Sequence, residues 1–96
     1  MNLRQLARGR ECTVRLPGIC NGDPATTVLA HYRLVGVSGL GMKSPDIFGA
    51  HACSACHDAI DRRTHTDLDR DYLHLAHLEG VIRTQAILIR EGAIKW

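Results

Sequence analysis

The sequence predicts a small α+β protein: a β-hairpin and a short helix joined through four cysteines, followed by a long C-terminal helix. Two cysteine pairs, Cys12 with Cys20 and Cys53 with Cys56, flank a segment rich in β-branched and apolar residues. In the last third of the chain, apolar residues recur at intervals of three and four, which is the helical period. Ninety-six residues make one domain, 1–96, with a core small enough that a metal or crosslink adds useful stability.

The N-terminal half predicts the hairpin. Residues 2–8 favour a short basic helical turn that ends at Gly9. Residues 12–20 suit a strand that runs into a Pro17-Gly18 turn, and residues 26–34 (TTVLAHYRL) suit the returning strand, which carries His31. Residues 35–45 contain three glycines and end in a proline, so they are predicted to form a loop.

The C-terminal half predicts two helices. The first covers residues 52–63 and is entered near Cys53. The run Thr66-Asp67-Leu68-Asp69 resembles a capping box and predicts a long helix that continues to about Glu91 and stops at Gly92. One apolar face of this helix is expected to be core or a dimer surface, and it comprises Leu68, Tyr72, Leu75, Leu78, Ile82, Ala86 and Ile89.

The formal net charge is +2, but basic residues are concentrated early in the chain. Residues 1–48 carry six Arg or Lys against three acids, whereas residues 49–96 carry six against seven. A basic face could meet phosphates, although solvated surface charge explains the same pattern equally well. The sequence shows no signal-peptide pattern and no apolar run of the ~18 residues needed to span a bilayer. We therefore expect a cytoplasmic protein without a membrane partner.

Four cysteines in a reducing compartment indicate a metal more often than disulfides. A structural Zn²⁺ on Cys12, Cys20, Cys53 and Cys56 is the favoured interpretation, although the first pair is spaced more widely than usual. Buried free thiols and a redox C-x-x-C are weaker alternatives. Residues 53–57 also spell the haem attachment motif C-x-x-C-H, with Met42 as a sixth ligand. That chemistry normally needs an exported chain and leaves Cys12 and Cys20 unexplained.

His57 and Asp61 are one helical turn apart, so both project from the same face. Together they could hold a catalytic divalent ion, or they could be an exposed polar pair. His65 would extend this face only if the helix continued that far. His31 lies in an apolar strand and is either a satisfied core histidine or a general base. We interpret the other three histidines as surface or structural residues: His51, His74 and His77.

A strand-borne histidine, a loop and then a helix that starts with C-x-x-C-H resemble the layout of zinc-containing HNH endonucleases, which have a ββα-metal, treble-clef-like fold. More closely, ARGRECTVRLPGICNG, LAHYRL and ACSACHDAIDRRTH resemble a family of short prophage-encoded nucleases. These are similar to a phage nuclease that acts together with the host recombinase. This closer resemblance covers residues 3–95.

The resemblance implies a DNA endonuclease in which His31 is the general base and His57, with Asp61, holds Mg²⁺ or Mn²⁺. The middle Asn of the HNH pattern has no clear counterpart, and Asp46 is the candidate for its place. Arg33, Lys43, Arg62 and Arg63 are candidates for holding neighbouring phosphates. A phage or host recombination protein is an implied partner. The alternative is a non-catalytic zinc-binding module that grips nucleic acid or protein.

Overall fold

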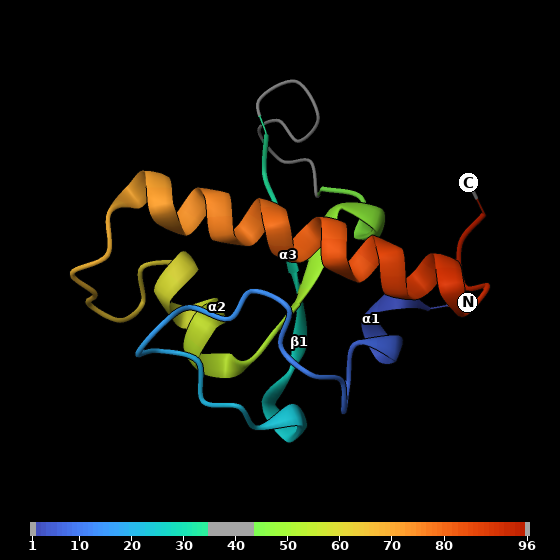
Figure 1. Cartoon of the computed structure of the whole chain (residues 1–96), viewed down its shortest axis with the longest axis horizontal. Coiled ribbons are helices and arrows are strands. Elements are labelled where there is room, and N and C mark those ends of the chain that lie inside the picture. Colours follow the sequence, from blue (N-terminus) through green and yellow to red (C-terminus); the bar gives the residue numbers. More distant parts are fainter. Residues whose placement is uncertain (1, 35–43, 96) are drawn as a thin grey trace.

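A computed structural model describes residues 2–34 and 44–95 of the chain. It is a small α+β structure in which a two-stranded sheet lies between a long C-terminal helix and shorter helices (Figure 1). The elements in chain order are α1 Leu3–Leu6, the 3₁₀ turn η1 Pro24–Thr26, β1 Val28–His31, the 3₁₀ turn η2 Asp46–Phe48, β2 Gly49–Ala52, α2 Ser54–Ile60 and α3 Arg70–Arg90. The predicted loop falls largely on residues 35–43, outside the described residues.

The predicted hairpin is corrected in one respect, because β1 does not pair with residues 12–20. Its partner is β2, which runs antiparallel with Ala30 opposite Ala50 and His31 opposite Gly49. Residues 12–20 form turns, since Arg15 (φ 55°) and Gly18 (φ 72°) adopt left-handed conformations and Pro17 lacks an N–H donor. The segment still touches the sheet, because the backbone N–H of Thr13 donates to the carbonyl of His51 at 2.7 Å.

The helix boundaries are shorter than predicted. Helix α2 begins after Cys53 rather than at Ala52, and it ends before Arg62, whose left-handed backbone (φ 59°) closes the last turn. The capping-box prediction at Thr66 is wrong: its hydroxyl accepts from the N–H of Leu68, and α3 begins only at Arg70. The predicted stop is confirmed, because Gly92 takes φ 73° and its N–H reaches the carbonyl of Ile89 at 3.1 Å. The basic helical turn at the N-terminus is confirmed as α1.

Helix α3 buries a different face from the one that its large apolar residues predict. The buried positions are Leu73, Ala76, His77, Gly80, Val81, Thr84 and Leu88. Gly80 explains why this face is buried, because a Cβ there would lie 3.0 Å from Val14 Cγ2 and 3.2 Å from Ala50 Cβ. The backbone of α3 therefore lies close against the sheet, and small side chains form that contact. Most of the predicted apolar face is left exposed.

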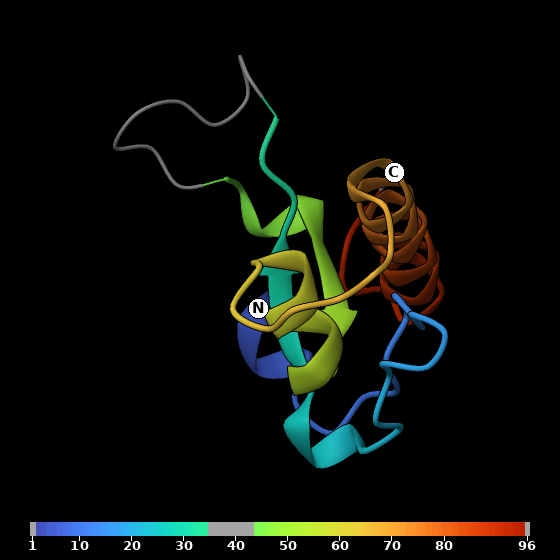
Figure 2. The same ribbon diagram turned by 90° about the vertical axis from the view of Figure 1, so that its left-hand side faces the viewer.

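A buried polar network fixes α3 to β2 and to the N-terminal segment. The Thr13 hydroxyl lies 2.9 Å from the carbonyl of His51, 3.1 Å from that of Gly80 and 3.0 Å from the Thr84 hydroxyl. Thr84 Oγ1 also accepts from the N–H of His51 at 3.0 Å. Seen end-on, α3 forms one outer side of the molecule (Figure 2). Among the described residues, no helix is both long and apolar enough to cross a bilayer.

Candidate metal centre and active site

The four cysteines converge on one point between the N-terminal segment and the start of α2. Their Sγ atoms all lie within 4.8 Å of one another, and the Sγ atoms of Cys53 and Cys20 are 3.8 Å apart. None of the four forms a disulfide. A tetrahedral Zn²⁺ with Zn–S bonds of about 2.3 Å places its sulfurs about 3.8 Å apart. The cluster could therefore hold a zinc ion, and the wide spacing of Cys12 and Cys20 is no obstacle.

Tight turns aim backbone N–H groups at these sulfurs. The N–H of Arg15 lies 3.5 Å from Cys12 Sγ, in the turn that needs the left-handed Arg15. The N–H of Cys56 lies 3.4 Å from Cys53 Sγ, which caps the N-terminus of α2. Donors that face sulfur favour the thiolate, which is the form that binds metal. Each cysteine pair therefore sits in a turn suited to ligation.

The packing of four sulfurs also shifts their ionisation. The pKa of Cys12 is lowered to about 4, chiefly because the Cys56 thiol donates to it and secondarily through backbone donors such as the N–H of Arg15. The pKa of Cys56 is raised by that same hydrogen bond and by burial, and the pKa of Cys20 is raised chiefly by burial. Four thiolates this close repel one another, so their joint ionisation needs a cation among them.

His31 ends β1 and pairs with Asp46, the first residue of η2. The distance from His31 Nε2 to Asp46 Oδ1 is 2.7 Å, and the His31 side chain is 27% exposed. Arg4 of α1 lies 3.7 Å from the other carboxylate oxygen of Asp46. Asp46 thus connects α1 to the histidine, and within residues 2–34 and 44–95 no hydrogen bond engages His31 Nδ1.

His57 and Asp61 form a second histidine–carboxylate pair on α2 and at its end. Their closest atoms, His57 Nε2 and Asp61 Oδ2, are 3.1 Å apart, and the side chains are 26% and 41% exposed. Arg63 lies 3.5 Å from the same carboxylate oxygen of Asp61. The two residues thus face each other at the surface, as their spacing predicts. Exposure leaves both pairs open to a polar ligand.

His77 of α3 contacts the strand that carries His31, and the sequence did not single it out as a site residue. Its Nε2 is 2.8 Å from the carbonyl oxygen of Ala30, the residue before His31, and its ring packs edge-on against Tyr32. Burial lowers the pKa of His77, while the nearby charge of Asp61 raises it. The sequence carried no signal for this role, because His77 lies on the buried face of α3 with Leu73, Ala76 and Gly80 and not on the face of large apolar residues. No contact between His31 and His57 themselves is seen in the described residues.

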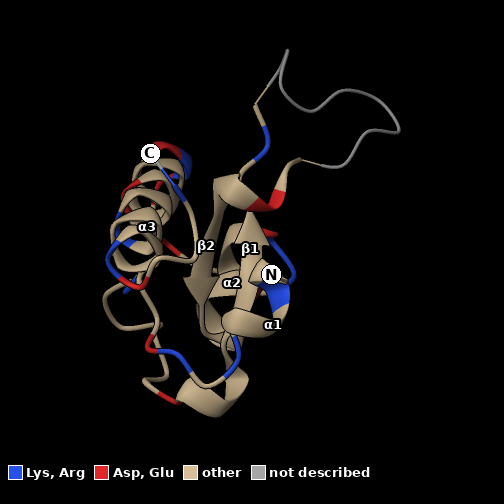
Figure 3. Ribbon diagram, turned by 90° about the vertical axis from the view of Figure 1, so that its right-hand side faces the viewer, with Lys and Arg blue, Asp and Glu red and all other residues tan. Residues whose placement is uncertain are grey.

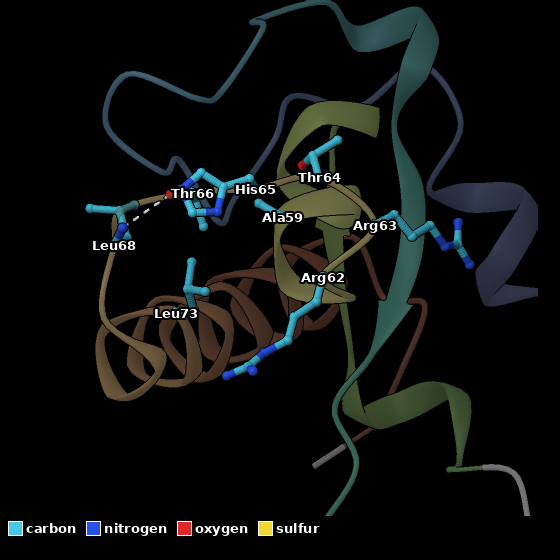
Figure 4. Close-up of a pocket in the computed structure, with 8 residues that line it drawn as sticks. All are labelled: Ala59, Arg62, Arg63, Thr64, His65, Thr66, Leu68 and Leu73. Atoms are coloured by element: carbon cyan, nitrogen blue, oxygen red, sulfur yellow. Dashed lines mark hydrogen bonds between the residues drawn. The ribbon is translucent and has the colours of Figure 1, made fainter.

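The basic residues that are candidates for holding phosphates are scattered. A pocket of about 400 Å³ lies between the end of α2 and the start of α3 and is lined in part by Arg62, Arg63 and His65 (Figure 4). The two arginine side chains extend in different directions from its rim (Figure 4). His65 pairs with Asp67 at 3.2 Å on the surface and is not a member of the ligand cluster found in the described residues. Arg33 is exposed, whereas Lys43 and Met42 lie outside the described residues.

Charge is mixed over the described surface. Figure 3 shows Lys and Arg interspersed with Asp and Glu along α3 and around the sheet. A nucleic acid would therefore meet local groups of charge rather than one uniformly basic face.

Fold and cysteine cluster together define a small α+β protein with four close cysteines that could hold a zinc ion. Comparison with known proteins identifies the family. The profile of the family described as "Putative nuclease YbcO" matches residues 1–93. The chain belongs to this family. The sequence is 58% identical over 94 residues to the "Putative nuclease YbcO" of Escherichia coli strain K12, which covers 98% of this chain and 97% of that protein.

Two further relatives agree with this assignment. The protein of the same description from Enterobacteria phage 82 is likewise 58% identical over 94 residues. A solved structure described as a putative bacteriophage protein from Escherichia coli K-12 superposes with a TM-score of 0.81 at 54% identity, over 95% of this chain and all of that one. The family description supports a nuclease role and a nucleic-acid substrate.

Proposed function

We propose that this protein is a metal-dependent DNA endonuclease of the HNH type. The observation that supports this function best is the presence of two partly exposed histidine–carboxylate contacts, His31–Asp46 and His57–Asp61. The second lies on α2, the helix that also carries Cys56 of the cysteine cluster. The family description supplies the class of substrate. The resemblance to HNH endonucleases supplies the roles.

His31 is the proposed general base. Because Asp46 accepts a hydrogen bond from the protonated Nε2, the neutral tautomer carries its free lone pair on Nδ1. Nδ1 then takes a proton from the water that attacks the phosphodiester. The carboxylate of Asp46 also stabilises the imidazolium that results. Arg4, beside Asp46, orients the carboxylate from its other oxygen.

His57 and Asp61 are the proposed ligands of a catalytic Mg²⁺ or Mn²⁺. Such an ion, when bound, stabilises negative charge on the phosphate and on the leaving oxygen. An imidazole nitrogen and a carboxylate oxygen on one face of α2 fit an open site that shares its remaining positions with water and phosphate. Asp61 also forms an ion pair with Arg63 at 3.5 Å, so a cation bound there would compete with this arginine for the carboxylate.

The four cysteines are the proposed structural zinc site. Zinc there ties the turn that carries Cys12 and Cys20 to the start of α2, so that β1 and α2 keep their relative positions. Arg33, Lys43, Arg62 and Arg63 are proposed to contact neighbouring phosphates without reading sequence. A phage or host recombination protein is the proposed partner.

The test is cleavage of supercoiled plasmid with Mg²⁺ or Mn²⁺ by wild type, His31→Ala and His57→Ala. His74→Ala is the matched control, because His74 is an exposed histidine of α3. We expect nicking by wild type and control only, with one zinc per chain in all four proteins. Nicking by every variant would refute the assignment of both histidines. Loss of zinc from His57→Ala would show that the two metal sites are not separate.

A plasmid that is shifted on the gel but never cut, by protein with full zinc content, would favour a non-catalytic zinc-binding module. Such a module requires the cysteine cluster and makes no demand on His31, His57 or Asp61.

A further inference from the structure

Helix α3 presents a face of large apolar side chains to solvent. Ile82 is 66% exposed, Leu75 57%, Tyr72 45% and Leu78 40%. These residues lie on the side of the helix opposite to the buried positions such as Ala76, Gly80 and Thr84. Nothing described covers this side, which forms an outer edge of the molecule (Figure 2). A contiguous apolar strip on a small protein indicates an interaction surface.

One edge of this face carries opposite charges that are not paired with each other. Glu79 and Arg83 are four residues apart, yet they form no ion pair within the described residues. Arg83 instead uses Nη1 to donate to the carbonyl of Thr13 at 2.8 Å, which leaves its other N–H groups available. A notch of about 150 Å³ lies along the same edge and is lined by Tyr72, Leu75, Glu79, Arg83, Arg15 and others.

We propose that α3 is a dimerisation helix, through which two copies of this chain pair antiparallel. The two-fold axis crosses the helices at the height of Val81. The inference concerns association and does not depend on the proposed nuclease chemistry. A two-fold axis perpendicular to both helices brings each edge of the face onto the same edge of the partner. Residues equally distant from Val81 in opposite directions therefore meet.

The sequence of the face is complementary to itself in this register. Glu79 and Arg83 each lie two residues from Val81, so each Glu79 meets the partner's Arg83, twice per dimer. Tyr72 and Arg90 each lie nine residues from Val81 on that same edge, which brings a guanidinium to each aromatic ring. Arg90 has no ion-pair partner in the described residues. Two acid–base pairs thus favour a second copy over an unrelated apolar partner.

The apolar side chains interleave in the same register. With the two-fold axis at Val81, the partner's Ile82 and Leu78 fall at the heights of residues 80 and 84, so Ile82 of each copy lies between them, as in packing of ridges into grooves. The two copies of Leu75 lie at opposite ends of this contact. A helix of 21 residues is about 30 Å long, and pairing two of them buries on the order of 1,000 Å² in total. This area is at the lower limit for a specific interface, so a dimer that dissociates on dilution is expected.

The test is sedimentation velocity of the full-length, zinc-loaded protein over a concentration range from micromolar to millimolar. Wild type is expected to shift from monomer to dimer. Ile82→Glu should weaken dimerisation roughly 100-fold or more, because it places two charges at the apolar centre of the interface. Leu34→Glu is the matched control, since Leu34 is 56% exposed but lies outside α3. Circular dichroism checks that both variants stay folded.

Charge exchange tests the register itself. Glu79→Arg should weaken dimerisation by setting arginine against arginine, and the double variant Glu79→Arg, Arg83→Glu should restore much of the loss. Wild type that stays monomeric at millimolar concentration would overturn the proposal. So would a dimer that tolerates Ile82→Glu, because another surface would then hold it. A dimer sensitive to Ile82→Glu but without rescue by the double variant would overturn the antiparallel register.

Discussion

The Asp46 carboxylate lies 2.7 Å from Nε2 of His31, so a residue of η2 holds the histidine at the end of β1. The two residues are fifteen apart in the chain and meet because β1 and β2 are antiparallel neighbours. Arg4 lies 3.7 Å from the same carboxylate. A partly buried histidine oriented by a carboxylate fits the role of general base that is proposed for His31.

Substitution of Asp46 should therefore affect cutting more than DNA binding. Asp46→Ala is expected to reduce the nicking rate about 10- to 100-fold, because His31 loses its orienting acceptor. Asp46→Asn keeps an acceptor oxygen but loses the charge that stabilises the imidazolium, so its rate should lie between those of wild type and Asp46→Ala. The measurement is the initial rate of plasmid nicking together with gel-shift affinity. Equal rates for wild type and Asp46→Ala would remove Asp46 from the proposed mechanism.

Metal removal should unfold the protein. Since the four sulfurs lie within 4.8 Å of one another, zinc binding links the N-terminal segment to α2. Small domains are stable by only about 5–15 kcal/mol, so the loss of a structural zinc is expected to cost most of the stability. Thermal unfolding with and without a strong chelator measures this loss. Cys56→Ser should behave like the chelated wild type.

Cobalt substitution provides the control for that prediction. Co²⁺ in a site of four thiolates gives intense visible absorption, which Cys56→Ser should lose. If the protein has the same melting temperature with and without the chelator, the cysteines are simply core residues.

Gly80 is expected to resist replacement. Alanine gains about 1 kcal/mol of helix propensity, but its Cβ would lie 3.0 Å from Val14, 3.2 Å from Ala50 and 3.3 Å from Thr13. Crowding from three sides costs about 1–3 kcal/mol, so Gly80→Ala should be destabilised by about 1 kcal/mol in net terms. Denaturant unfolding measures the difference. A more stable Gly80→Ala would show that α3 can move away from the sheet.

The local patterns predicted most of the elements but not the pairing of β1. The spacing of His57 and Asp61 and the stop at Gly92 depend only on helix geometry, and both appear in the structure. Residues 12–20 look like a strand by composition, yet they turn at the left-handed Arg15, whose N–H lies 3.5 Å from Cys12 Sγ. The demands of the cysteine cluster override strand propensity there.

The buried face of α3 could not be predicted for a related reason. Hydrophobic periodicity identifies the face with Leu75 and Ile82, because it weighs side-chain size and apolarity. The structure buries the face with Gly80 and Thr84, since small side chains permit close contact and Thr84 completes a buried hydrogen-bond network. His77 belongs to the same face, so its contact with Ala30 was equally hidden from the sequence pattern.

His77 also makes stability depend on pH. Burial is the main reason that its pKa is lowered in the folded protein, although its hydrogen bond to Ala30 acts in the opposite direction. The unfolded chain therefore binds a proton near the ordinary histidine pKa of about 6.5, while the folded protein does not until the pH is lower. Stability should be lost as pH falls below about 6.5, at up to about 1.4 kcal/mol per pH unit for each such histidine.

His77→Gln isolates this contribution, because glutamine can donate to the Ala30 carbonyl but does not titrate. His51, whose pKa is also lowered mainly by burial, remains in both proteins, as does the effect of acid on the cysteines. The free energy of unfolding, measured in denaturant from pH 7.5 to 5.5 with zinc in excess, should therefore fall less steeply for His77→Gln than for wild type. Equal slopes would mean that His77 is protonated as readily in the folded protein as in the unfolded chain.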